Sequence, residues 1–133
     1  VIVQYNTTYG LKVDQIGPYK LALGRNRVTD EFSKVTILDV KHPIFNLPNA
    51  ITPNDWNGWV QERGLYFASE WDKAYKPLIS WSDKGEDPTE GGLLVAKHGK
   101  GSFTYTGISF FRELPAGVSG AYRLFANMIE YQP

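Results

Sequence analysis

The sequence predicts a mixed α/β domain, and three observations support this prediction. The chain opens on a continuous apolar run over residues 1–5, which is typical of a strand buried on both faces of a sheet. Residues 93–97 and 103–110 flank the glycine-rich turn 99–101 and predict a β-hairpin. Residues 119–130 carry apolar side chains at helical spacing. We therefore expect a mixed sheet with a C-terminal hairpin and helix, in a single domain over residues 1–133.

The first apolar run also leads to an expectation about the chain as a whole. A strand buried on both faces is flanked by other strands, whereas chain ends usually lie at the surface. We therefore expect residues 1–5 to lie in the interior of the sheet, and the chain to be the C-terminal portion of a larger domain. The alternative is an edge strand of a complete small domain.

Shorter elements are predicted along the first two thirds of the chain. Thr52, Pro53 and Asp55 have the residue types of an N-cap, a first helical position and an acidic first turn, so a short helix is expected to end near residue 58 or 59. Residues 83–91 form an expected charged surface loop. Apolar and β-branched runs predict strands at 11–13, 19–23, 35–38, 64–67 and 77–81.

The hairpin and the last helix allow a prediction of which side chains share a face. In the second hairpin strand, one face is expected to carry Thr104, Thr106, Ile108 and Phe110, and the other Phe103, Tyr105 and Gly107. Ser119 is the predicted N-cap of the helix. Its apolar stripe is predicted to consist of Ala121, Leu124, Phe125, Met128 and Ile129.

Composition argues against several classes of function. The 14 Lys and Arg residues balance 14 Asp and Glu residues, and this zero net charge argues against a nucleic-acid-binding protein. The chain has no cysteine, which excludes disulfides, cysteine-ligated zinc and a cysteine nucleophile. No apolar run reaches the ~18 residues of a membrane span. The compartment is not fixed by these data, and a periplasmic or extracellular location is favoured over the cytoplasm.

Neither a metal site nor a cofactor site is predicted. The two histidines, His42 and His98, are far apart and lack an acidic neighbour in sequence. His42 precedes a proline and is expected to bond the backbone in a turn, while His98 is expected to be solvated at the end of a hairpin strand. The acidic loop lacks the ligand spacing of an EF-hand. No Gly-x-Ser-x-Gly nucleophile motif is present, and we assign no catalytic residue.

Two polar segments are the candidates for a binding site. Residues 59–64 and 110–115 each place an arginine beside a glutamate, next to aromatic residues. Arginine and glutamate can hold a sugar or a carboxylate by paired hydrogen bonds, and aromatic rings can stack on a pyranose. The alternative is that the pairs fix loops and that the tryptophans belong to the core. The candidate ligand-binding residues are Trp59, Glu62, Arg63, Arg112 and Glu113.

Aromatic residues are dense in the middle of the chain. The tryptophans are Trp56, Trp59, Trp71 and Trp81, all within 26 positions of sequence. This density would suit a carbohydrate-binding surface. It would equally suit a large contact with a neighbouring domain.

These segments resemble a known family. The similar stretches are residues 42–46, 59–67, 90–97, 99–101, 105–117 and 120–127. Together they resemble the C-terminal region of bacterial PIG-L family deacetylases, of the long type that carries a class I glutamine amidotransferase-like domain. The resemblance covers nearly the whole chain. It implies a flavodoxin-like layer in which residues 1–5 form an interior strand.

The resemblance implies a scaffold without the chemistry of either family. PIG-L deacetylases remove the N-acetyl group of an amino sugar at a zinc site with a His-Pro-Asp-Asp type motif. Here His42 and Pro43 are followed by Ile44 and Phe45, so the acidic residues of that motif are missing. The cysteine of glutamine amidotransferases is missing as well. No catalytic residue carries over from either family.

The function implied by the resemblance is a non-catalytic accessory domain of a sugar N-deacetylase. Its expected partners are the N-terminal part of the same protein and a carbohydrate. One alternative is a self-contained carbohydrate-active hydrolase that uses acidic residues, with Glu62, Glu70, Asp72 and Glu113 as candidates. Another alternative is a structural oligomerisation module.

Overall fold

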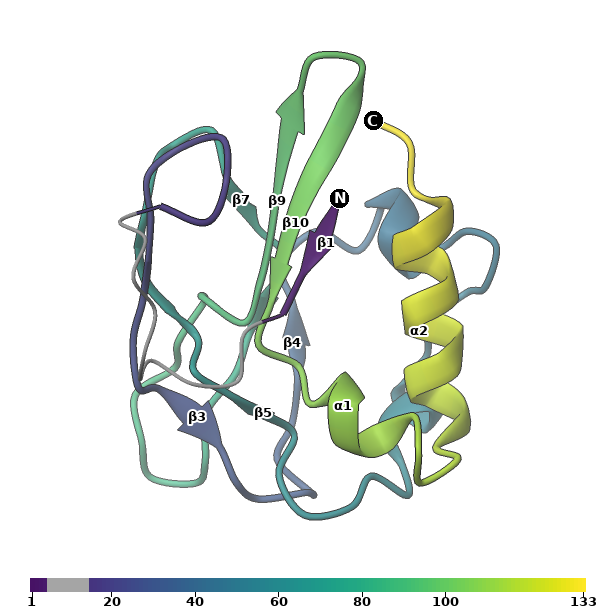
Figure 1. The fold of residues 1–133 in the computed structure, drawn as a ribbon. Coiled ribbons are helices and arrows are strands. Elements are labelled where there is room, and N and C mark those ends of the chain that lie inside the picture. Colours follow the sequence, from purple (N-terminus) through teal and green to yellow (C-terminus); the bar gives the residue numbers. More distant parts are fainter. Residues whose placement is uncertain (5–14) are drawn as a thin grey trace.

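The computed structural model describes residues 1–4 and 15–133 and has a mixed α/β architecture (Figure 1). Its largest sheet has four strands in the order β1-β10-β9-β7. β1 runs parallel to β10, whereas the β10–β9 and β9–β7 pairs are antiparallel, so the sheet is mixed as predicted. The strands are β1 (Ile2–Val3), β7 (Lys76–Pro77), β9 (Leu93–His98) and β10 (Gly101–Thr106).

Three two-stranded antiparallel pairs and four helices complete the described fold. The pairs are β2 (Leu21–Leu23) with β6 (Ala68–Trp71), β3 (Arg27–Val28) with β5 (Gly64–Leu65), and β4 (Thr36–Ile37) with β8 (Ile79–Ser80). The helices are the 3₁₀ turns η1 (Pro43–Phe45) and η2 (Pro53–Trp56), the short α1 (Phe110–Glu113) and the long α2 (Ser119–Glu130).

One predicted strand is shorter than expected, and another changes partner along its length. The run predicted at 64–67 ends at Leu65, because Tyr66 adopts a left-handed backbone with φ of 56°. The next strand, β6, begins at Ala68, beyond the predicted run. The run predicted at 77–81 is divided because β7 pairs with β9 and β8 pairs with β4. Local sequence does not show such a change of partner, since residue types indicate strand character and not which strand each residue will meet.

The first strand lies at the edge of the four-stranded sheet, so the prediction of an interior strand was wrong. Val1 is 79% exposed, and Ile2 and Val3 are half-buried. Ile2 packs against one hydrophobic cluster and Val3 against the other. The sheet separates two cores, so an apolar run is expected even in an edge strand. The predicted end of this strand at Tyr5 and the strand predicted at 11–13 lie outside the described residues.

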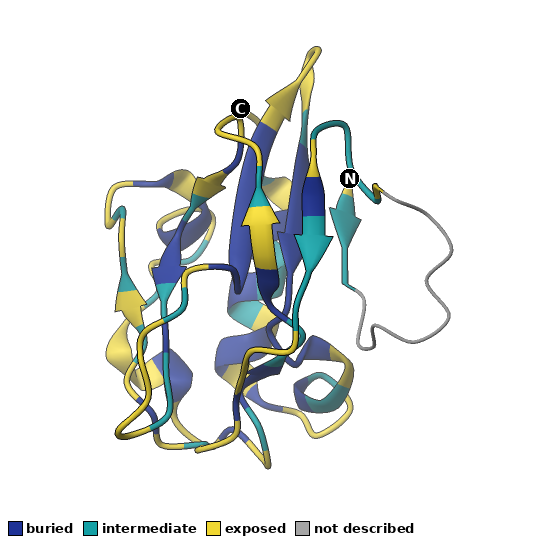
Figure 2. Cartoon of the chain, turned by 90° about the vertical axis from the view of Figure 1, so that its left-hand side faces the viewer, coloured by how far each residue is buried: buried dark blue, intermediate teal, exposed yellow. Residues whose placement is uncertain are grey.

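The hairpin of β9 and β10 separates the two cores. The predicted alternation of its side chains between the two faces is confirmed within these strands. Tyr105 is the register partner of Leu94, and both belong to the smaller cluster on one face. Val95 faces the larger cluster, which α2 covers on the other side of the sheet (Figure 1). Figure 2 shows the buried stretches of these strands in the middle of the molecule. β10 ends at Thr106 rather than at the predicted Phe110, because Phe110 begins α1.

The long helix α2 covers residues 119–130 as predicted. Its N-cap is Val118 rather than Ser119, which is already helical. Ile129 is 59% exposed, although it was assigned to the apolar stripe. A Cβ atom on Gly120 would lie 1.7 Å from the carbonyl oxygen of Asp55, so this glycine permits the close contact of α2 with η2. Within the described ranges, no helix has the length and apolar character needed to cross a bilayer.

Candidate functional site

The structure brings the two Arg–Glu segments side by side. Gly64 forms an isolated antiparallel bridge with Ile108, which joins the first segment to the chain just before α1. The backbone of Arg63 is held from both sides: its N–H donates to the Val28 carbonyl at 2.9 Å, and its carbonyl accepts from the Ser109 N–H at 3.0 Å. The position of Arg63 is therefore set by backbone bonds from two parts of the chain.

Side-chain bonds connect the same two segments. Arg112 Nη2 lies 2.7 Å from Glu62 Oε1, and its Nη1 donates to the side-chain oxygen of Gln61. Gln61 has a φ of 59°, a conformation that non-glycine residues rarely adopt. From α1, Glu113 Oε2 accepts the backbone N–H of Val60 at 3.0 Å. These contacts support the interpretation that both glutamates and Arg112 fix the loop before β5.

Arg63 is enclosed by three indole rings. Arg63 is only 4% exposed. Its Cζ lies 6.0 Å from the ring centroid of Trp56 and 5.9 Å from the ring centroids of Trp59 and Trp81. A guanidinium at this distance from aromatic faces gains cation–π stabilisation. Its Nε and Nη1 atoms are buried and have no hydrogen-bond partner among the described residues. Arg63 is therefore a buried cation with unused donors.

The three tryptophans around Arg63 belong to the core. Trp56 and Trp59 are stacked at 5.1 Å, and the Trp59 Nε1–H donates to the Asp55 carbonyl at 2.8 Å. The Trp81 Nε1–H donates to the Ser33 hydroxyl at 2.9 Å. All three rings are more than nine-tenths buried. Three of the four tryptophans thus form a cage inside the protein and not an exposed platform for sugar stacking, whereas Trp71 is half-buried against the smaller cluster.

Burial dominates the electrostatics of the site. It lowers the pKa of the Arg63 guanidinium, while the negative charges of Asp30 and Glu113 act in the opposite direction. Glu113 is completely buried, and burial raises the pKa of its carboxyl group against the effect of the Val60 N–H. Its Oε1, like the hydroxyl of Ser109, has no hydrogen-bond partner in the described part of the chain.

A pocket of about 310 Å³ opens beside Arg63. Two of its lining residues, Lys34 and Arg63, are cationic, and no acidic residue is found among the described residues that line it. Trp56 forms an aromatic part of its wall, and Asn57 contributes an amide. The full lining is Phe32, Ser33, Lys34, Val35, Ile37, Pro53, Trp56, Asn57 and Arg63.

Comparison of the chain with protein-family models, with curated proteins and with solved structures found no match. The resemblance to PIG-L deacetylases and to glutamine amidotransferase-like domains therefore stays a prediction. The residues of the site and their geometry are the remaining guide to function.

The four carboxylates considered for hydrolysis have separate roles. Glu62 pairs with Arg112, and Glu113 is buried, as described above. Glu70 forms an exposed ion pair with Lys20 at 3.0 Å. Asp72 closes a turn by accepting the Ala74 N–H at 2.8 Å. In the part of the chain that the structure describes, no group of three or more His, Cys, Asp or Glu side chains is arranged to hold a metal ion.

Both histidines behave as expected from the sequence. His42 is the N-cap of η1, and its Nδ1 accepts the Ile44 N–H at 3.3 Å, which confirms the predicted turn contact. The ring of Tyr131 lies 5.0 Å from the His42 ring. His98 is exposed at the end of β9, which confirms that it is solvated.

His42 makes the stability of the protein sensitive to pH. Burial lowers its pKa from the ordinary 6.5, and a protonated Nδ1 could no longer accept the Ile44 N–H. The folded pKa lies below the unfolded pKa, so this contribution to stability is complete above 6.5 and is lost as pH falls through the lowered value. We expect urea unfolding to show a decrease in stability as the pH falls below about 6.5.

The matched variants are His42→Gln and His98→Gln. His42→Gln should flatten this part of the pH profile, whereas the exposed His98→Gln should leave it unchanged. Equal slopes in the wild type and in His42→Gln would show that another group causes the pH dependence.

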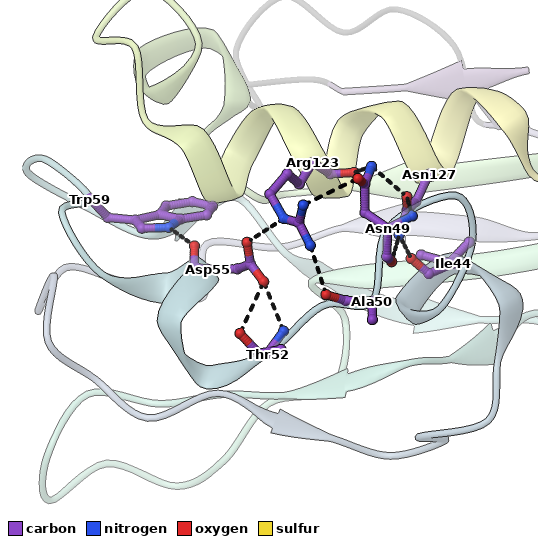
Figure 3. Close-up of polar contacts among 8 residues, drawn as sticks. All are labelled: Ile44, Asn49, Ala50, Thr52, Asp55, Trp59, Arg123 and Asn127. Carbon is purple, nitrogen blue, oxygen red and sulfur yellow. Dashed lines mark hydrogen bonds and ion pairs between the residues drawn. The ribbon is translucent and has the colours of Figure 1, made fainter.

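A second polar cluster was missed by the sequence analysis. It joins α2 to the segment between η1 and η2 (Figure 3). Asn127 Nδ2 donates to the Ile44 carbonyl at 2.8 Å and to the Asn49 carbonyl at 2.7 Å, and its Oδ1 accepts the Asn49 N–H at 2.9 Å. The signal in the sequence was a polar residue on the apolar face of the helix, between Leu124 and Met128.

The same cluster continues to η2 through an arginine. Arg123 Nε lies 2.8 Å from Asp55 Oδ1, and its Nη2 donates to the Ala50 carbonyl at 2.9 Å (Figure 3). The other carboxylate oxygen of Asp55 accepts the Thr52 N–H at 2.8 Å, which confirms the predicted helix start at Thr52. These bonds are internal to the fold, and we assign the cluster a structural role.

Proposed function

We propose that this chain is a non-catalytic accessory domain that binds a ligand or a partner rather than transforming it. The observation that supports this proposal best is the state of Arg63. It is buried in an aromatic cage, its Nε and Nη1 have no partner among the described residues, and it lines a pocket. An arginine that has unpaired donors and lines a pocket is suited to binding a ligand or a partner.

The environment of the glutamates favours binding over hydrolysis. General acid–base chemistry on a sugar requires carboxyl groups that reach the substrate. Glu113 is 0% exposed and bonds the Val60 N–H, while Glu62 is held by Arg112. Both carboxylates therefore connect protein segments to each other.

The proposed context is a PIG-L-type sugar N-deacetylase with a flavodoxin-like accessory layer. The support is the sequence resemblance over nearly the whole chain, together with the mixed sheet. The outer edge of β1 is not paired with any described strand, and an edge of this kind can accept another strand. In that context the domain would contact the catalytic module, a carbohydrate, or both.

Isothermal titration tests this proposal with two kinds of partner. The domain is titrated with N-acetylglucosamine and its short oligomers, and separately with a zinc deacetylase module expressed on its own. We expect heat from at least one of them, and no release of acetate by the domain alone. Absence of heat from both would reject an accessory binding role.

Two other outcomes would favour the alternatives. Hydrolysis that disappears in Glu62→Gln or Glu113→Gln would identify the chain as a hydrolase. A stable multimer in sedimentation, without binding of either partner, would favour an oligomerisation module.

A further inference from the structure

The helix α2 is apolar on two sides. Its inner side packs into the larger hydrophobic cluster, and α2 itself lies at an outer side of the molecule (Figure 1). A second stripe follows the i, i+3, i+4 and i+7 spacing of one helix face and consists of Tyr122, Phe125, Ala126 and Ile129. We call it the outer stripe. Tyr122 is 52% exposed and Ile129 is 59% exposed, whereas Phe125 and Ala126 are half-buried. A surface helix needs one apolar stripe to pack on its core, so a second stripe indicates a contact surface.

Two apolar hollows adjoin the outer stripe. The larger hollow, of about 870 Å³, lies at the C-terminal end of α2, where Ala126 and Ile129 line it together with Leu47 from the segment after η1. Leu47 is itself 64% exposed. The smaller hollow, of about 460 Å³, is lined by Phe125 and by Phe111 of α1. The outer stripe therefore joins both hollows into one apolar surface.

The outer stripe is matched to a second copy of itself. Its spacings are three, one and three positions, so it reads the same in both directions along the helix. Two copies with antiparallel α2 helices, related by a two-fold axis next to Ala126, place Tyr122 of each copy opposite Ile129 of the other. Tyr122 leans toward the N-terminal end of α2, because its hydroxyl donates to the Leu114 carbonyl at 2.7 Å. This end meets the larger hollow of the other copy, and the same contact forms twice, as in a closed two-fold dimer.

The charges of α2 favour the same antiparallel arrangement. Glu130 is the last residue of the helix, while its first turn has no acidic residue and its last turn has no basic residue. A negative charge is unfavourable at the C-terminal end of a helix and favourable at the N-terminal end. In an antiparallel pair, Glu130 of each copy lies near the N-terminal end of the other α2. The net charge of zero means that two copies do not repel each other.

We propose that this chain forms a two-fold dimer through the outer stripe, with the two α2 helices antiparallel. This inference goes beyond the proposed binding function and does not depend on it. Arg63 lines neither of the two hollows beside the stripe, so the pocket at Arg63 is separate from the proposed interface.

Sedimentation equilibrium of the whole chain, from about 10 µM to about 1 mM, tests the dimer. We expect a monomer–dimer equilibrium with a dissociation constant below about 200 µM. Ile129→Asp places a charge at the centre of the interface and should weaken the dimer by about 10-fold or more. The matched control is Phe32→Asp, which changes an 83% exposed residue that lines neither hollow and should leave the dimer unchanged. Thermal unfolding verifies that both variants are folded.

Cross-linking tests the orientation of the two helices and does not depend on the aspartate variants. The chain has no cysteine, so an introduced thiol is the only one in each copy. In the antiparallel dimer Ala126→Cys lies next to its own counterpart, so mild oxidation should link two copies of this variant. Tyr122→Cys lies about 10 Å along the helix from its own counterpart, which is too far for a disulfide. It should link only when mixed with Ile129→Cys.

Several results would overturn the inference. A monomer up to about 1 mM would reject the dimer. A dimer that is unchanged by Ile129→Asp, or that is lost in Phe32→Asp, would place the interface elsewhere. Efficient linkage of Tyr122→Cys to itself would show parallel helices.

The dimer and the proposed function can fail separately. If the chain stays monomeric and Ile129→Asp abolishes the heat of binding to the deacetylase module, the outer stripe binds that module. The proposed function then stands, and the inference of a dimer fails. A dimer that gives no heat with amino sugars or with the module would support this inference and reject the proposed function.

Discussion

Replacement of Asn127 by alanine is expected to lower the free energy of unfolding by about 4 kcal/mol. Asn127 is completely buried, and its amide satisfies the Ile44 carbonyl and both backbone groups of Asn49. Alanine would leave these groups buried without partners, and each such group costs about 1–3 kcal/mol. It would also leave a small cavity beneath α2. Urea denaturation followed by circular dichroism measures the loss.

Two further variants distinguish the loss of the buried hydrogen bonds of Asn127 from the loss of an asparagine side chain in general. Asn127→Asp keeps an acceptor but loses both donors and buries a charge, so it should be at least as destabilising as alanine. The exposed Asn54→Ala should change stability by no more than about 0.5 kcal/mol. A loss below about 1 kcal/mol for Asn127→Ala would mean that the segment before η2 is not held by this residue.

Replacement of Glu113 by alanine is expected to cost about 3–4 kcal/mol of stability. The change removes the acceptor of the Val60 N–H, so this donor loses its partner. It also opens a cavity at a fully buried position. Denaturant unfolding at neutral pH measures this effect, with the exposed Glu86→Ala as the matched control near zero.

Glu113→Gln tests the charge of this residue separately from its shape. Burial raises the pKa of Glu113 above 4.5, so the folded state holds its proton more tightly than the unfolded state does. The protonated form of Glu113 therefore contributes to the free energy of unfolding. This contribution is complete below the unfolded pKa and is lost as pH rises through the folded pKa. Glutamine does not ionise, so the variant should gain stability relative to the wild type as pH rises above about 4.5. A stability difference that is constant with pH would contradict a raised pKa.

The local pattern of the sequence determined the elements whose partners are close in the chain. The β9–β10 hairpin was predicted because its turn and its alternation are continuous in sequence, although β10 begins at Gly101 rather than Phe103 and ends at Thr106 rather than Phe110. The helix at residues 119–130 was predicted because its apolar spacing repeats over its full length. The helix start at Thr52 was visible from three residue types alone.

Elements that depend on a distant partner were predicted less well. The run at residues 1–5 correctly indicated a strand, but its place at the edge of the sheet depends on β10, about 100 residues away. The division of the run at 77–81 likewise depends on which strand each part meets. The apolar residues of a strand indicate that its faces are buried. They do not indicate how many strands lie beside it in the sheet.

The candidate site shows the same division. The sequence by itself identified the two Arg–Glu segments, and it left open whether they bind ligand or fix loops. Tertiary structure decided that Arg112 pairs with Glu62 and that Arg63 lies apart from them inside three tryptophans. The reason is physical: residue type sets which bonds a side chain can form, but burial and proximity of distant segments set which of those bonds are formed and which donors remain free.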